Sequence, residues 1–156
     1  EEILLAYMEK YNVPICIIRL FSVTGVGEQK EHLIPKLIDS CLNGTKMDFV
    51  PNPVHDWISM EDVVDGILNL SEHGARGIFE LGTGIGTPND DVRKIVEKVT
   101  GKKANIDIVN QMRDYDNQEW VSTNFRARMY GWLVQKSLEQ SRGFAEVFRS
   151  LHWKYK

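Results

Sequence analysis

The residues of this sequence that could carry chemistry follow no known catalytic or metal-binding spacing. The chain has no Gly-x-Ser-x-Gly motif, and neither Cys16 nor Cys41 is joined to a histidine by a motif. No metal-like spacing relates the cysteines to the histidines, which are His32, His55, His73 and His152. The residue types alone therefore establish neither an active site nor a metal site.

A glycine-rich turn at residues 82–86 lies between a predicted strand and a predicted helix, where a dinucleotide could bind. Its third glycine comes one position too early for the G-x-G-x-x-G fingerprint. The helix that follows opens with Asp90 and Asp91, whose negative charge would repel a pyrophosphate from an end that attracts anions. We interpret these acids as capping residues, which argues against dinucleotide binding at this turn.

The composition excludes two classes of partner. The formal net charge is −3 and the basic residues form no run, so nucleic acid is not an expected partner. No apolar run approaches the roughly 20 residues of a membrane span, and the first residues show helical periodicity in place of a signal peptide. Cys16 and Cys41 fit small buried hydrophobes, which indicates a reducing compartment. We expect a soluble, cytoplasmic protein without a membrane partner.

Hydrophobic periodicity and turn residues predict alternating helices and strands, as in an α/β protein. Helices are predicted at 2–11, 33–43, 60–73, 88–100, 126–130 and after residue 137, and strands at 15–18, 46–50, 54–58, 77–81 and 104–109. Ser59 has the position of an N-cap in a capping box. Thr87 is the expected N-cap of the next helix, with Pro88 at its first position.

Two of these strands carry expectations about the sheet. The apolar run at 15–18 is typical of a strand covered on both faces in a parallel sheet, yet only one helix precedes it. We expect this strand to lack neighbours within the chain, and therefore to be covered by another chain or a swapped copy in a homo-oligomer. The strand at 77–81, the helix after it and the strand at 104–109 predict a right-handed βαβ unit.

Residues 19–27, Arg-Leu-Phe-Ser-Val-Thr-Gly-Val-Gly, resemble the Arg-x-Phe-Asn-Val-Tyr-Gly-Pro signature of the extended short-chain dehydrogenase/reductases. This family contains the NAD-dependent nucleotide-sugar epimerases and dehydratases. Further segments resemble its motifs in the same order, some of them those of dTDP-glucose dehydratases: 1–14, 31–35, 55–62, 79–84, 130–132 and 137–139. The ordered series identifies the chain as a relative of this family.

The resemblance implies a fold and a missing part. It covers the C-terminal half of a family member, so we expect the C-terminal portion of a Rossmann-like α/β fold with a small substrate-binding α/β region. In one partial domain, residues 1–24 would be the remnant of the Rossmann sheet and 25–156 the substrate-binding region. The family's glycine-rich cofactor loop and its catalytic Tyr-x-x-x-Lys would precede Glu1. NAD(P) is thus implied for a full-length member, and no catalytic or cofactor-binding residue is expected here.

The resemblance also implies the substrate-binding residues, and several of them depart from the family. Ser22 stands in place of an Asn that contacts the sugar nucleotide, and His32 in place of a Lys before Leu33. His55 replaces an Arg that binds the diphosphate. A neutral histidine lacks both the forked pair of N–H donors of a guanidinium group and its permanent charge. Arg113 matches one family Arg, whereas Glu119 stands where another is usual. The pocket is either retuned for a different ligand or decayed.

Two hypotheses of different classes follow. In the first, the chain is the substrate-binding portion of an NAD-dependent epimerase/dehydratase-like protein, binds a nucleotide sugar or related small molecule, and is inactive alone. It would then pair with an N-terminal half. In the second, it is a degenerate, non-catalytic module that keeps the scaffold and associates through exposed surfaces. The sequence does not choose between them.

Overall fold

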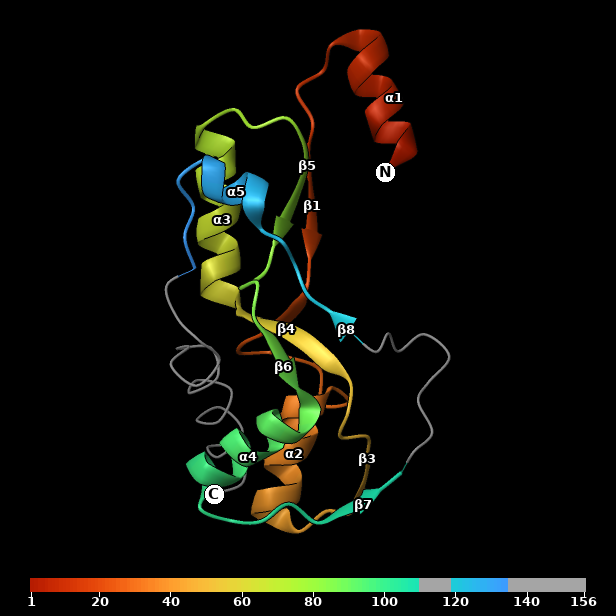
Figure 1. Ribbon diagram of the computed structural model, residues 1–156, viewed down its shortest axis with the longest axis vertical. Helices are drawn as coiled ribbons and strands as arrows, with labels where there is room; N and C mark the ends of the chain where they lie inside the picture. Colours follow the sequence, from red (N-terminus) through yellow and green to blue (C-terminus); the bar gives the residue numbers. More distant parts are fainter. Residues whose placement is uncertain (110–118, 135–156) are drawn as a thin grey trace.

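Two hydrophobic cores, one on each face of strand β4 (Val54–Ser59), organise the fold (Figure 1). The computed structural model describes residues 1–109 and 119–134. Successive residues of a strand point to opposite faces. Trp57 accordingly belongs to one core and its neighbour Ile58 to the other. The strand therefore couples the two halves of the structure.

The first core forms around a parallel pair of strands. Strand β1 (Cys16–Leu20) pairs along its whole length with β5 (Gly77–Leu81). Helices α3 (Met60–Glu72) and α5 (Phe125–Met129) cover the pair, and the buried residues include Phe79, Leu81 and Trp132. The expectation that the first strand lacks neighbours within the chain is wrong, because a strand far along the sequence supplies one edge. Ser59 caps α3 as predicted, since its Oγ accepts from the amide of Asp62 at 3.1 Å.

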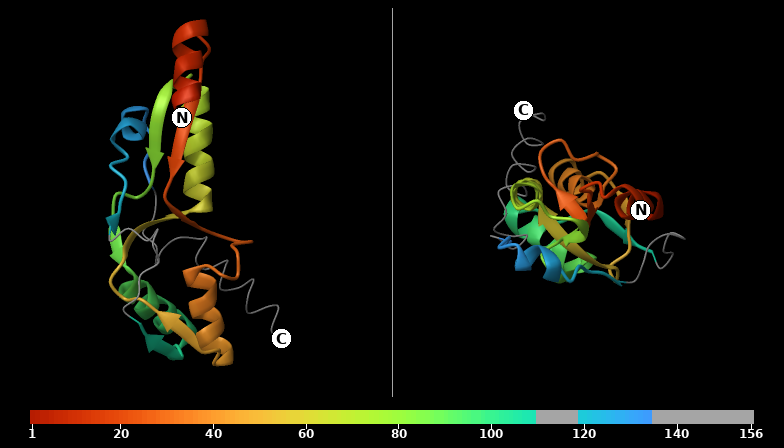
Figure 2. Two further views of the ribbon diagram at one scale, coloured as in Figure 1. Left: turned by 90° about the vertical axis from the view of Figure 1, so that its right-hand side faces the viewer. Right: turned by 90° about the horizontal axis from the view of Figure 1, so that it is seen from above.

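The second core lies between two helices and a second parallel pair. Helix α2 (Leu33–Asn43) packs against α4 (Asn89–Thr100), and β3 (Met47–Phe49) pairs with β7 (Ile106–Ile108). Both helices end as predicted at a glycine in the left-handed conformation. The left view of Figure 2 shows these elements gathered at the end of the molecule away from α1 (Glu2–Tyr11).

A central sheet joins the cores. Strand β4 pairs in parallel with β2 (Ser22–Thr24) and β8 (Glu119–Trp120), and antiparallel with β6 (Gly86–Pro88). The predicted βαβ unit is therefore wrong: β5 pairs with β1 and β7 with β3, in different sheets. Thr87 is not an N-cap, because it lies in β6 opposite His55 and α4 begins only after Pro88.

Helix α1 has the predicted bounds but stands apart from both cores (Figure 1). None of its residues is buried, and its apolar side chains Ile3, Leu4, Tyr7 and Tyr11 are exposed. Arg19 of β1 holds the start of the chain through an ion pair of 2.6 Å to Glu1. The helix predicted after residue 137 lies outside the described residues. No helix in the described part of the chain is long and apolar enough to cross a membrane.

Candidate functional site

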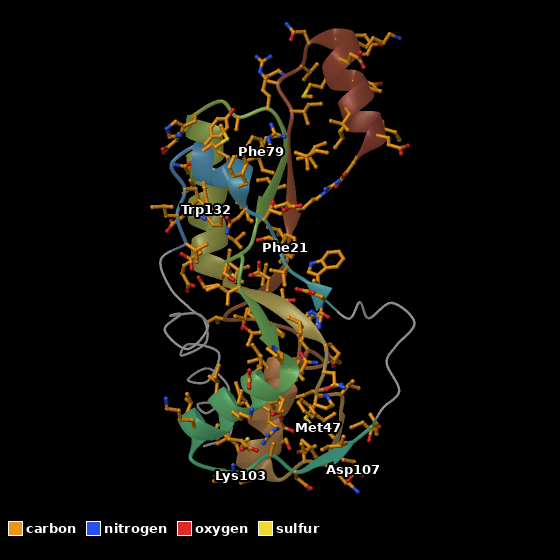
Figure 3. The ribbon with its side chains drawn as sticks, in the orientation of Figure 1. Phe21, Met47, Phe79, Lys103, Asp107 and Trp132 are labelled. Carbon is orange, nitrogen blue, oxygen red and sulfur yellow. The ribbon has the colours of Figure 1, made fainter. Side chains whose placement is uncertain are left out.

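The pocket beside β4 and α2 is the candidate site, with a volume of about 550 Å³. Figure 3 labels Phe21 and Met47 from its lining, which come from distant parts of the sequence. Four of the five residues implied by the resemblance line it: Ser22, His32, Leu33 and His55. The fifth, Arg113, lies outside the described residues. That these residues bind substrate remains a prediction.

One wall of the pocket consists of neighbouring strands. Strands β2 and β4 are in register with Ser22 opposite Trp57, and alternation along β4 places His55 on the same face as Trp57. Ser22 Oγ lies 3.4 Å from His55 Nδ1, and the rings of His55 and Trp57 have centroids 5.8 Å apart. Beside this wall, Phe21 packs on the half-exposed ring of Trp120, with centroids 5.6 Å apart.

The N-terminus of α2 forms a second wall. The helix begins at Leu33, after His32 in an extended conformation, and no side chain of the described residues caps it. Its first turn also lacks an acidic residue, whereas α1, α3 and α4 each have at least one there. The amide of His32 donates to Gln29 and Pro35 has no N–H, so the amides at this end are those of Leu33 and Ile34. Such amides and the helix dipole make a helix N-terminus attractive to anions.

Glu28 contributes a buried carboxylic acid to the same pocket, and no motif in the sequence pointed to it. Its side chain is only 5% exposed, and Thr24 Oγ1 donates to its Oε2 at 2.9 Å. Oε1 lies 3.4 Å from His32 Nδ1, which is within ion-pair distance. Burial raises the pKa of Glu28, while the hydrogen bond from Thr24, the nearby imidazole of His32 and the backbone of Gly25 oppose the rise.

Two more lining residues carry unused polar atoms. The indole Nε1 of Trp57 and the Oδ1 of Asn89 are buried, and neither has a hydrogen-bond partner in the described part of the chain. Asn89 Nδ2 donates to the carbonyl oxygen of Val50 at 3.1 Å, so Oδ1 is the amide atom that points away from Val50. Buried polar atoms are nearly always paired in native proteins, so these two atoms are exceptions within the described residues.

The charges of the described lining residues are mainly negative. The described lining has one lysine, Lys36, and three carboxylates, those of Glu28, Glu31 and Asp48. The described lining therefore offers less positive charge than the arginine-bearing family pattern described above. Among the described residues, no group of His, Cys, Asp and Glu has the arrangement of a metal site.

The opposite face of β4 explains the glycine-rich turn. Asp56 is fully buried, and its carboxylate accepts from the amides of Thr83, Gly84 and Ser122 and from the hydroxyls of Thr83 and Ser122. A Cβ on Gly82 would overlap the Asp56 and Ser122 side chains, so only glycine fits there. The amides of this turn therefore donate to the protein's own carboxylate and are not available to bind a dinucleotide pyrophosphate.

Comparison with known proteins decides the family. The profile of the "NAD dependent epimerase/dehydratase family" matches residues 1–82, which is more than half of the sequence. The chain belongs to the NAD-dependent epimerase/dehydratase family. This confirms the resemblance at the level of the family.

Relatives within this epimerase/dehydratase family are distant. The chain is 31% identical over 145 residues to a UDP-glucose 4-epimerase of Rhizobium meliloti, covering 78% of this chain and 44% of the relative. It is 27% identical over 140 residues to the low-salt glycan biosynthesis protein Agl12 of Haloferax volcanii, covering 86% of this chain and 44% of that protein. The chain thus spans less than half the length of these curated relatives.

The fold of the family is present as well. The structure of a UDP-glucose 4-epimerase from Thermotoga maritima with UDP-glucose superposes with a TM-score of 0.87 at 20% identity, covering 99% of this chain and 51% of that one. This confirms the predicted Rossmann-like α/β fold class.

Proposed function

We propose that this chain is the substrate-binding part of a nucleotide-sugar epimerase or dehydratase, and that it holds a nucleotide sugar in the pocket between α2 and β4. The observation that carries the proposal is the convergence of Ser22, His32, Leu33 and His55, from separate segments, on one pocket at an uncapped helix N-terminus. The diphosphate would lie at the amides that begin α2, where the dipole compensates in part for the missing arginine.

The proposal also includes the organisation of the longer protein. The chain would be one partial domain, in which residues 1–24 contribute to the Rossmann-like sheet and 25–156 hold the substrate-binding region. NAD(P) and the catalytic Tyr-x-x-x-Lys would belong to another half, without which the chain is inactive. A dTDP-glucose dehydratase-like substrate is one form of the proposal, and the relatives named for UDP-glucose favour a uridine nucleotide.

Removing a single amide tests where the diphosphate binds. Proline is tolerated at the first position of a helix and has no N–H, and the extended backbone of His32 suits a residue before proline. We expect Leu33→Pro to weaken UDP-glucose binding by about tenfold in calorimetry, the value of one charge-assisted hydrogen bond. Leu33→Ala, which shortens the side chain but keeps the amide, should bind UDP-glucose much more like the parent chain.

Two outcomes would contradict this proposal. If the parent chain does not bind UDP-glucose, the pocket is not a nucleotide-sugar site. If Leu33→Pro and Leu33→Ala bind equally well while circular dichroism shows both folded, the diphosphate does not lie at this helix end.

A second proposal, association with another chain, rests on α1. Helix α1, whose apolar side chains are exposed, precedes β1, whose one pairing among the described strands is with β5. An uncovered apolar helix beside a free strand edge favours contact with a second copy or with a separate N-terminal half. Light scattering should give a mass above that of the monomer for the chain alone, and a monomeric mass at micromolar concentration would contradict self-association.

A further inference from the structure

Two histidines line the pocket where a ligand can reach them. His32 directly precedes α2 and 52% of its side chain is exposed, while His55 of β4 is partly exposed. Histidine is the side chain that ordinarily gains a proton between about pH 8 and about pH 5. The charge of the pocket beside the N-terminus of α2 therefore depends on pH.

The neighbours of both rings accommodate the protonated form. His32 Nδ1 lies 3.4 Å from Glu28 Oε1, and this contact becomes an ion pair when the ring is protonated. His55 Nδ1 lies 3.4 Å from Ser22 Oγ, and a hydroxyl group donates to a neutral ring or accepts from a charged one. Neither contact therefore has to break when the ring gains a proton.

The other charged groups near the two rings leave the pocket negative while the rings are neutral. The described lining has one lysine and three carboxylates, which are those of Lys36, Glu28, Glu31 and Asp48. Beside β4, the paired residues of β2 and β6 have no acidic or basic side chain, and β8 contributes the carboxylate of Glu119. Protonation of both histidines cancels the excess of two negative charges in the described lining.

We propose that the pocket takes up protons on His32 and His55 when it binds the diphosphate of its ligand, so that its affinity for a nucleotide sugar rises from about pH 8 to about pH 5.5. The inference rests on the proposed function, because it concerns the diphosphate of a bound nucleotide sugar. The protons come from the solvent, and the two charged rings add the positive charge that the described lining otherwise lacks.

The ligand supplies the driving force for this proton uptake. A diphosphate that is esterified at both ends keeps its negative charges over this pH range, so the ligand itself does not titrate. An imidazolium that donates to a phosphate oxygen forms a charge-assisted hydrogen bond, which tightens binding about tenfold relative to the neutral ring. By linkage, the bound diphosphate favours the protonated rings to the same extent.

Calorimetry with UDP-glucose and the full chain tests the inference. We expect UDP-glucose to bind about 50-fold more tightly at about pH 5.5 than at about pH 8, which is about sevenfold for each histidine. Titrations near pH 7 in buffers that differ in ionisation enthalpy count the protons taken up. They should give about one proton for each ligand bound, because each ring is then about half converted by binding.

Two substitutions of His55 remove its titration in opposite ways. His55→Arg is charged throughout, so it should bind more tightly than the parent chain at about pH 8 and reduce the ratio of the two affinities to about sevenfold. His55→Gln is neutral throughout, so it should give the same reduced ratio but weaker binding at about pH 5.5. Circular dichroism at both pH values checks that the variants are folded.

A double variant separates the histidines from Glu28. Burial raises the pKa of Glu28, so the loss of its charge as the pH falls acts in the same direction. With His32→Gln and His55→Gln combined, only the carboxylates still titrate, and the ratio should fall to about threefold or less. His73→Gln is the matched control, because it removes a histidine at the C-cap of α3, outside the lining of this pocket. It should keep the full ratio.

The outcomes separate this inference from the proposed function. If UDP-glucose binds the parent chain at neither pH, both fail together. If it binds equally well at both pH values without proton uptake, the inference fails while the nucleotide-sugar pocket stands. If the double variant keeps the ratio of the parent chain, or if His73→Gln lowers it as much as His55→Gln does, the two pocket histidines are not the groups that titrate, and the inference is overturned.

Discussion

Replacing Asp56 with alanine is expected to lower the free energy of unfolding by about 3–5 kcal/mol, because it leaves several buried donors without an acceptor. The donors are two groups of Thr83, two of Ser122 and the amide of Gly84. Water cannot easily replace the carboxylate, since Asp56 is fully buried. Urea denaturation followed by circular dichroism measures the change.

Asp65→Ala is the control, because this aspartate lies exposed in α3. It should change the free energy of unfolding by about 0.5 kcal/mol or less. The substitution at Asp56 should also weaken ligand binding, since the same strand carries His55 and Trp57 into the pocket on its other face. A loss below about 1 kcal/mol for Asp56→Ala would contradict the view that this carboxylate holds the glycine-rich turn in place.

Replacing His55 with arginine is expected to tighten UDP-glucose binding by about tenfold, or about 1.4 kcal/mol. The guanidinium restores a permanent charge and a planar fork that binds phosphate oxygens in pairs. His55 lines the pocket 3.4 Å from Ser22, on the wall that adjoins the N-terminus of α2. Calorimetry on the folded variant gives the affinity.

His55→Lys separates charge from geometry. Lysine adds the same charge without the fork, so it should give a smaller gain than arginine. If arginine gives no gain while the variant remains folded, His55 does not face the diphosphate, and the pocket has been retuned for a ligand that binds differently.

Local signals predicted the helices well. Helix α1 has the predicted bounds, α2 ends at Gly44, and Ser59 caps α3, because each depends on residues within one or two turns. Long-range pairing was not predictable in this way. The partner of β1 lies some sixty residues later in β5, and hydrophobic patterns show that both are strands without showing that they pair.

The misplaced start of α4 has a tertiary cause. Thr87 and Pro88 suit a helix N-terminus by type, but residues 86–88 pair with β4, and the amide of Asn89 donates to Pro53. Pairing with another part of the chain overrides the local preference, as propensities are weak relative to tertiary contacts.

The sequence predicted those residues of the candidate site that belong to family motifs. Ser22, His32, Leu33 and His55 came from the family resemblance, and the structure gathers them in one pocket. Glu28 and Asn89 lie outside the motifs, and Trp57, although it lies within the 55–62 motif, was not expected to line the pocket, because which residues surround a pocket is visible only in three dimensions. For Glu28, its place in the loop after residues 19–27 was the one available hint.

A crystal structure of the chain soaked with UDP-glucose tests the central claim most directly. We expect the diphosphate within about 3 Å of the Leu33 amide at the start of α2. Diphosphate density among the lysines at the far end of α4, Lys94, Lys98, Lys102 and Lys103, with an empty pocket beside β4, would contradict it.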